Sequence, residues 1–163
     1  MFFLMALFAA AMPQNVYIQP MTLVSSHVEQ IAMIGPDQKA VARIRADKRD
    51  CPACNLAGAD LTNTCVKKGN LTGANFDRAN ATLMCMSYAN FTNASFQGTI
   101  LDGANLAHAD LDGANFKGAS LVATSFKGTD LRKARGLTQA QLTQACGDAD
   151  TKAPAGLTVP RCS

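Results

Sequence analysis

The stretch ANFKGASLVATSFKGTDL, from Ala114 to Leu131, has an apolar residue at every fifth position: Phe116, Leu121, Phe126 and Leu131. Ala or Thr stands two places before each of these residues. A period of five belongs neither to an α-helix, with about 3.6 residues per turn, nor to a strand, in which side chains alternate. The stretch therefore predicts a regular structure whose sides are five residues long.

The same period extends well beyond this stretch. From Cys54 the chain divides into sixteen consecutive five-residue blocks that end at Lys133 without an insertion. Every central residue is apolar, and the residue two places earlier is small in every block except the one with Met84. Asn, Asp or Ser stands directly before the centre in thirteen of the sixteen blocks. The central residues are Leu56, Leu61, Val66, Leu71, Phe76, Ala81, Met86, Phe91, Phe96, Leu101, Leu106, Leu111, Phe116, Leu121, Phe126 and Leu131.

This pattern resembles the pentapeptide-repeat family, whose block reads A-(D/N)-L-x-x, over 80 residues of the chain. The resemblance implies an all-β solenoid, a right-handed quadrilateral β-helix in which each block forms one side of a square. Four blocks make one coil, so residues 54–133 would form about four coils. Parallel strands lie about 4.8 Å apart, so residues twenty positions apart should stack on one another.

The narrow shaft of such a solenoid constrains its core. The central residue and the small residue two places before it should both point inward, because a side has no room for two large side chains. Phe76, Phe96 and Phe116 are therefore predicted to form a ladder with Leu56 at its foot. Asn and Asp beside the corners should bond nearby backbone groups where the chain turns.

Both ends of a solenoid need caps. At the N-terminal end, G-P-D-Q from Gly35 predicts a helix start with Pro36 in the first turn. Val41 and Ile44 give this helix a modest apolar stripe, and it should end before Pro52. We therefore expect a short helix to cap this end of the rod.

The C-terminal end carries a second helix signal. Beyond the last block the period fails, and Thr138 and Gln141 form a capping box. Gly147 can end a helix in the left-handed conformation. A helix over Thr138–Cys146 is therefore predicted to close this end, followed by an irregular tail held by Cys162.

The N-terminus reads MFFLMALFAAAMPQ. Its apolar run from Met1 to Ala11 is typical of a secretory signal, with cleavage near Ala11, although no Lys or Arg precedes it. The run is too short to span a bilayer, which needs about 20 residues. An apolar strand or helix of the fold is the alternative, and residues 13–34 suit a strand, a helix or a tail. The expected divisions are a signal region 1–11, an N-terminal segment with capping helix 12–50, the repeats 54–133, and the C-terminal helix and tail 134–163.

Six cysteines in a short chain with a signal-like start indicate an oxidising compartment. Cys65 and Cys85 both stand just before a block centre and are twenty residues apart. Their Cα atoms should lie about 5 Å apart, within the range that a disulfide needs. A bridge between Cys146 and Cys162 would fasten the C-terminal helix to the tail.

Cys51 and Cys54 then remain as C-P-A-C, and a bridge between Cys51 and Cys65 stays open as an alternative. C-P-A-C also suggests a redox protein, in which a reactive C-x-x-C usually sits at a helix N-terminus. Here Cys54 instead fills an inward slot of the first coil. A structural role is favoured, and an exported thiol-redox protein remains the alternative from the enzyme class.

Nothing else in the sequence predicts catalysis, a metal or a cofactor. Glu29 is the one glutamate, and it lies outside the repeats. His27 and His108 are isolated, so no second pair of ligands completes a zinc site. The chain contains neither a P-loop nor G-x-S-x-G. The sequence therefore predicts a protein that is not an enzyme.

Two outward strips remain as interaction surfaces. One is the most chemically varied strip on the rod, and it consists of Lys67, Lys68, Tyr88, His108 and Lys127. The other places apolar residues where polar ones are usual, at Leu83, Ile100 and Val122. An outward apolar strip indicates either packing of the N-terminal segment or a partner interface.

The leading hypothesis is a non-enzymatic structural or protein-interaction module, exported to the bacterial periplasm or secreted. Its partner would be a protein rather than a nucleic acid, a homodimer stays open, and no stable membrane span is expected after processing. The family also includes gyrase-protecting proteins that resemble DNA in shape and charge, which is the alternative. Residues 54–133 contain seven Lys or Arg and six Asp, whereas a DNA mimic needs a negative surface.

Overall fold

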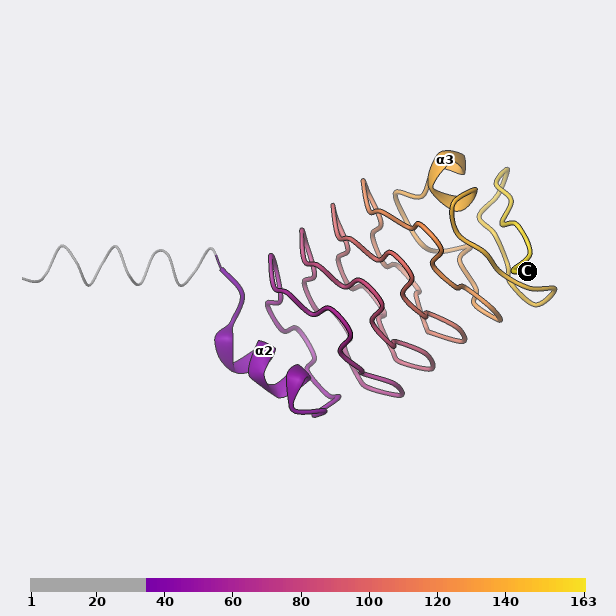
Figure 1. Ribbon diagram of the computed structural model, residues 1–163. Helices are drawn as coiled ribbons and strands as arrows, with labels where there is room; N and C mark the ends of the chain where they lie inside the picture. The colour runs from indigo at the N-terminus through magenta and orange to yellow at the C-terminus, as the bar shows by residue number, and fades with distance from the viewer. Residues whose placement is uncertain (1–34) are drawn as a thin grey trace, which may run out of the picture.

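The computed structural model describes residues 35–163 as a rod of stacked coils with a helix at its N-terminal end (Figure 1). The predicted signal region 1–11 and residues 12–34, which include His27 and Glu29, lie outside the described residues. Within residues 35–163, neither helix has the length and apolar character needed to cross a membrane.

The coils are joined by a regular ladder. Isolated parallel bridges link residues twenty positions apart, from Asn55 with Asn75 to Asn115 with Arg135. The N–H of Leu56, for example, donates to the carbonyl of Asn75 at 2.7 Å. Because each 20-residue coil is made of four five-residue sides, the fold is a quadrilateral β-helix.

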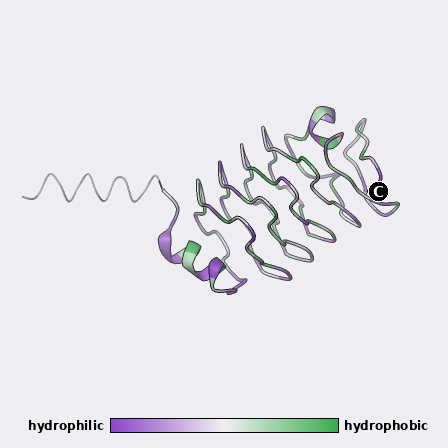
Figure 2. Cartoon of the chain, viewed as in Figure 1, coloured by the Kyte–Doolittle hydropathy of each residue, from purple (hydrophilic) through white to green (hydrophobic). Residues whose placement is uncertain are grey.

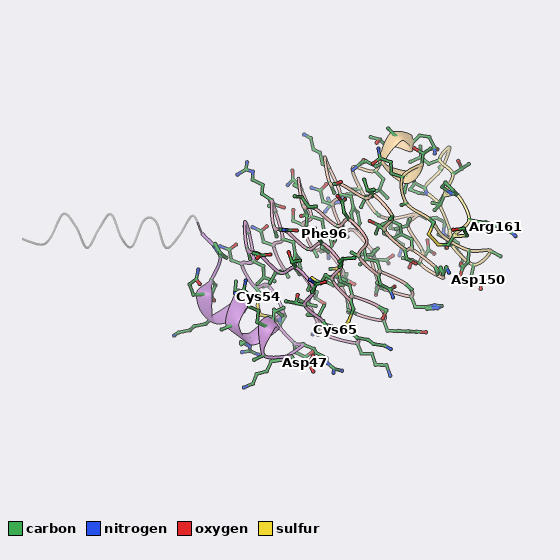
Figure 3. The ribbon with its side chains drawn as sticks, viewed as in Figure 1. Asp47, Cys54, Cys65, Phe96, Asp150 and Arg161 are labelled. Atoms are coloured by element: carbon green, nitrogen blue, oxygen red, sulfur yellow. A yellow bond between two sulfur atoms is a disulfide. The ribbon has the colours of Figure 1, made fainter. Side chains whose placement is uncertain are left out.

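The core is the predicted ladder of aromatic rings inside the shaft. The rings of Phe76 and Phe96 are stacked with centroids 5.0 Å apart, and those of Phe96 and Phe116 follow at 5.1 Å. Figure 3 labels Phe96 midway along the rod. Leu56 is fully buried, as its place at the foot of the ladder requires. The predicted Phe ladder is confirmed.

Threonine replaces alanine in four of the small inward slots, and three of these residues, Thr99, Thr124 and Thr129, are buried. The hydroxyl of Thr99 donates to the carbonyl of Phe76 at 2.7 Å, and that of Thr124 donates to Leu101 at 2.8 Å. Each acceptor belongs to the preceding coil, so a buried hydroxyl adds a bond between coils. Among residues 35–163 no buried side-chain nitrogen or oxygen lacks a partner, as expected for buried polar groups.

Asn and Asp beside the corners bond the local backbone, as predicted. The side chain of Asn75 accepts the N–H of Asp77 at 2.9 Å, two residues further on. The same contact recurs at Asn70, where the acceptor also receives the hydroxyl of Thr72. These side chains satisfy backbone donors that face outward at each turn and cannot join the ladder.

Serine at the same position is too short to make this contact, and at Ser95 and Ser120 an aspartate of the preceding coil takes its place. The carboxylate of Asp77 accepts both the hydroxyl of Ser95 and the N–H of Gln97, the latter at 3.0 Å. Asp102 accepts the hydroxyl of Ser120 in the same way. The outward backbone N–H at such a corner is therefore bonded by a side chain of the preceding coil instead of one of its own coil.

The N-terminal end of the shaft is covered by α2, which spans Gln38–Arg45. Asp37 is its N-cap and accepts the N–H of Lys39 at 2.9 Å, so Pro36 precedes the cap and does not occupy the first turn as expected. Figure 2 shows apolar and polar residues mixed along this short helix. The helix residues buried against the core of the rod are Ala40, Val41 and Ile44.

The C-terminal helix is shorter than the expected span. α3 covers only Gln139–Leu142, with the predicted capping box between Thr138 and Gln141 present. The chain leaves the helix because Cys146 returns to the ladder, where its N–H donates to the carbonyl of Thr124 at 2.9 Å. Leu142 is fully buried and continues the inward series of apolar residues.

The tail is also more regular than predicted. Lys152 forms a parallel bridge with Asp130, and Arg161 forms one with Gly147. The half-buried side chains of Leu157 and Val159 pack against the core. The C-terminal end of the shaft is therefore covered by the tail together with the residues around α3.

The corners generate a first prediction. Gly118 has φ +69° and no heavy atom within 4 Å of an added Cβ, whereas Ala123 occupies the same position of the next block at φ +55°. Gly118→Ala should lower the free energy of unfolding by about 1 kcal/mol, because only the backbone conformation is penalised. Ala123→Gly is the matched control and should leave stability unchanged or slightly higher. Urea unfolding measures both, and an unchanged midpoint for Gly118→Ala would contradict the explanation.

Candidate interaction surface

The six cysteines of the rod are joined in three disulfides. Cys65 and Cys85 lie at the same position of neighbouring coils, with Cα atoms 4.6 Å apart. Figure 3 places Cys54 and Cys65 toward the α2 end of the rod. The structure joins the six cysteines as Cys51–Cys54, Cys65–Cys85 and Cys146–Cys162.

Cys51 begins the ladder one block earlier than the sequence indicated. Its N–H donates to the carbonyl of Asn70 at 2.8 Å, and the N–H of Cys54 donates back to the carbonyl of Cys51 at 3.3 Å. C-P-A-C is therefore a corner of the first coil, and Cys51 fills the central inward position with 4% of its surface exposed. No helix starts at this pair, since α2 ends at Arg45. The alternative bridge between Cys51 and Cys65 is not formed.

The bridge between coils generates a second prediction. Replacing Cys65 and Cys85 together by Ser should lower the free energy of unfolding by about 3 kcal/mol, because the bridge closes a loop of sequence separation 20. Replacing Cys51 and Cys54 together is the comparison, and its loss of chain constraint should be smaller because their separation is 3. Urea unfolding of the oxidised proteins measures both effects. An equal stability of wild type and the Cys65/Cys85 variant would contradict the prediction.

One side of the rod, the basic face, is formed by the four blocks centred on Val66, Met86, Leu106 and Phe126. It contains every residue of the chemically varied strip that the sequence indicated. All five are exposed to solvent: Lys67, Lys68, Tyr88, His108 and Lys127.

An aromatic pair lies at the middle of the basic face. The rings of Tyr88 and His108 are stacked with centroids 4.7 Å apart and an interplanar angle of 15°. The Nζ of Lys67 lies 6.0 Å from the centroid of the Tyr88 ring, at the edge of the range for a cation–π contact. The sequence placed these residues on one face but did not indicate that the rings stack.

The adjacent side of the rod, centred on Leu71, Phe91, Leu111 and Leu131, carries charges that pair with one another. Arg132 contacts Asp130 at 2.6 Å, and Lys152 contacts the same carboxylate at 3.9 Å. Lys133 pairs with Asp112 at 2.5 Å. Within residues 35–163, no ion pair includes a residue of the basic face. Of the five cations of the repeats that form no ion pair, three therefore lie on the basic face, and Arg78 and Lys117 lie on another side.

The ion pairs generate a third prediction. The hydrogen bond from Arg132 and the nearby charges of Arg132 and Lys152 lower the pKa of Asp130 to about 2. A lowered folded-state pKa gives stability that is complete above the ordinary carboxyl pKa and is lost as pH falls through the folded value. Wild type should therefore lose more unfolding free energy than Asp130→Asn between about pH 5 and about pH 2. Asp150→Asn removes an exposed carboxylate outside the ion pairs as a control, and parallel curves for wild type and Asp130→Asn would contradict the prediction.

The second strip that the sequence indicated forms an apolar patch on the other neighbouring side. Leu83 is 57% exposed, Ile100 43% and Val122 46%. No described residue covers the patch, and residues 12–34, the expected cover, lie outside the described part of the chain. A side chain of Leu83 reaches over Gly103, where an added Cβ would come within 2.6 Å of it. The side chain of Leu83 therefore extends over the next coil.

Two shallow hollows lie elsewhere on the described surface, and neither suggests chemistry. One, of about 370 Å³, is lined in part by Asp47 and Arg49, which pair with each other. The other, of about 420 Å³, is lined by the ion-paired residues around Asp130. Residues 35–163 contain no cluster of three or more His, Cys, Asp or Glu suited to a metal ion. The basic face thus offers the most distinctive chemistry of the described surface.

A family model of pentapeptide repeats, in eight copies, matches residues 54–87, 89–128 and 109–146. These matches cover more than half of the chain, so the protein belongs to the pentapeptide-repeat family, whose fold is a right-handed quadrilateral β-helix. Members of this family are generally non-enzymatic structural modules. The match continues past the last block recognised in the sequence, in keeping with the return of Cys146 to the ladder.

Solved structures of the same family resemble the chain. A pentapeptide repeat protein (Rfr23) of the cyanobacterium Cyanothece 51142 is 23% identical over 70% of this chain and 97% of its own, with a TM-score of 0.37. One from Nostoc PCC 7120 is 24% identical over 72% and 95%, with a TM-score of 0.40. QnrB1, a plasmid-mediated fluoroquinolone resistance protein, is 21% identical over 68% and 60%, with a TM-score of 0.36. A search of curated protein sequences returned no match.

Proposed function

We propose that this protein is an exported, disulfide-bonded module that holds a partner protein on its surface and performs no catalysis. The basic face is the observation that carries the proposal. Its lysines form no ion pair with any described residue, and its Tyr88–His108 stack is exposed on a rigid rod. Exposed Tyr is among the residues enriched at protein interfaces, and unpaired lysines attract a partner surface of opposite charge.

Export is supported by the cysteines together with the N-terminal sequence. All six cysteines lie in three disulfides, and bridges of this kind persist in oxidising compartments. The apolar run from Met1 to Ala11 supports removal of a signal region near Ala11. The periplasm of a bacterium, or the medium outside the cell, is the expected location.

The alternative of gyrase protection by DNA mimicry is less well supported. It requires an acidic surface that competes with DNA for a basic groove. The repeats instead carry nearly balanced charge, and one side of the rod is basic. A cytoplasmic target would also leave the three disulfides without an oxidising environment.

The alternative of thiol-redox catalysis has less support as well. Cys51 is buried in the shaft, and the C-P-A-C corner is held in the ladder by the bond from Cys51 to Asn70. A catalytic pair needs an accessible sulfur of lowered pKa, usually at a helix N-terminus. The position of this pair supports a structural role instead.

Two measurements test the proposal. A tagged protein should fractionate outside the cytoplasm, and a thiol-specific reagent should add mass only after reduction. A photo-cross-linking amino acid at position 127, on the basic face, should then yield a discrete cross-linked partner in that compartment. The same amino acid at position 117, which is the equivalent position of another side, is the control and should not yield it. A cytoplasmic protein with free thiols would refute export, and equal or absent cross-linking at the two positions would refute the interaction.

A further inference from the structure

The basic face has an unusual charge distribution for a rod that is nearly neutral. Residues 54–133 contain seven Lys or Arg and six Asp. Lys67, Lys68 and Lys127 lie in the four blocks of the basic face, and no Asp or Glu lies in those blocks. The carboxylate of Asp148, just beyond these blocks, accepts the N–H of Gly128 at 2.8 Å. The face therefore attracts a negative ligand and has no internal counter-charge.

The Tyr88–His108 stack limits which classes of negative ligand can bind the basic face. Lys67 lies over one side of the Tyr88 ring and His108 covers the other. The free side of the His108 ring faces Gly128, where an added Cβ would come within 2.3 Å of it. The sides of the Tyr88 and His108 rings that face each other are thus covered by the stack, while both side chains remain exposed to solvent. A ligand on this face meets the side chains of Tyr88 and His108, which can form hydrogen bonds, with Lys67 and Lys68 toward one end and Lys127 toward the other.

Two classes of polyanion are disfavoured on this face. Nucleic acids without a sequence code bind by stacking bases on aromatic faces, whereas here the Tyr88 and His108 rings stack on each other. Anionic membranes need a cluster of about four to eight basic residues, more than the three lysines of this face. Carboxylates, by contrast, need only cations and hydrogen-bond donors at their edges.

The spacing of the row suits an extended polypeptide. Coils repeat about every 4.8 Å, so Lys67 and Lys127, three coils apart, are separated by about 14 Å along the rod. An extended chain advances about 3.3 Å per residue and directs alternate side chains to one side. Side chains at positions i, i+2 and i+4 of such a chain therefore span about 13 Å. The first and last would reach the lysines, and the middle one would reach Tyr88 and His108.

We infer that the basic face binds an extended acidic segment of a partner protein, one that carries carboxylates at three alternate positions. The inference rests on the proposed function and names the chemistry of its partner. Lys67, Lys68 and Lys127 bind the outer carboxylates as ion pairs, and Tyr88 and His108 donate to the central one. Since the lysines are exposed, the affinity depends on salt.

The probe is a fluorescein-labelled peptide of the pattern Ser-Glu-Ser-Glu-Ser-Glu-Ser, titrated with the oxidised full chain and followed by anisotropy. Replacing Lys67 and Lys127 together by Gln should weaken binding by at least about tenfold. Lys117→Gln is the matched control, because Lys117 is an exposed lysine at the same block position on another side, and it should leave binding unchanged. Tyr88→Phe keeps the stack and removes the hydroxyl, and it should weaken binding by about three- to fivefold. A peptide with the three Glu adjacent should bind more weakly than the alternating one.

Several results would overturn the inference. These are no binding of the alternating peptide, an equal loss in Lys117→Gln, or an equal affinity of the two peptides. Lysine-dependent binding of single-stranded DNA, a sulfated polysaccharide or vesicles with about 30% anionic lipid, without binding of the peptide, would also overturn it. A partner that still cross-links at position 127 when the peptide fails would retain the proposed function and reject only the acidic segment.

Discussion

The backbone bonds between successive coils are the constraint on which the whole rod depends. The central N–H of each block from Leu56 to Leu106 donates to a carbonyl nineteen residues further on, as Leu56 does to Asn75. Each of these coils must therefore contain the same number of residues. A single inserted residue would move all later side chains out of register with the coil beneath. The register shifts only at the C-terminal end, where Ser125 pairs with Cys146 and α3 takes up the extra chain. The tail beyond it covers the shaft, so the altered register is not passed on to another coil.

Because of this strict register, residues at equivalent positions of successive coils stack on one another. Inside the shaft it stacks Phe76, Phe96 and Phe116, and outside it stacks Tyr88 on His108. It also divides the charges, because residues twenty positions apart share a side. Ion pairs join the charges on the side centred on Leu111 and Leu131, whereas the lysines of the basic face form none, although the repeats as a whole are almost neutral. A rigid scaffold with chemically distinct sides suits recognition of a partner better than catalysis, which needs a concave site that excludes water.

Much of the fold was predictable because the repeat is local and its twenty-residue consequence is geometric. The Phe ladder and the corner bonds of Asn75 followed from the five-residue pattern, and so did the two residues of the α3 capping box. The sequence did not reveal the hydrogen bonds that side chains make between neighbouring coils. Ser95 lacks the reach for a corner bond, and Asp77, eighteen residues earlier, supplies it. The starting block with Cys51 was missed as well, because a cysteine at a block centre does not match the family pattern.

The sequence by itself determined the side length of the square, the residues that face its shaft and the residues that share each outer side. These follow from periodicity, which is written in the order of the residues. Only the tertiary structure decided how the outer side chains use their positions: which charges pair, that the Tyr88 ring stacks on His108, and that the tail returns to cover the last coil. Those outcomes depend on rotamers, and on chain ends where no repeating neighbour dictates the contact. A periodic sequence therefore determines which residues share a side of the rod, whereas packing determines how their side chains contact one another.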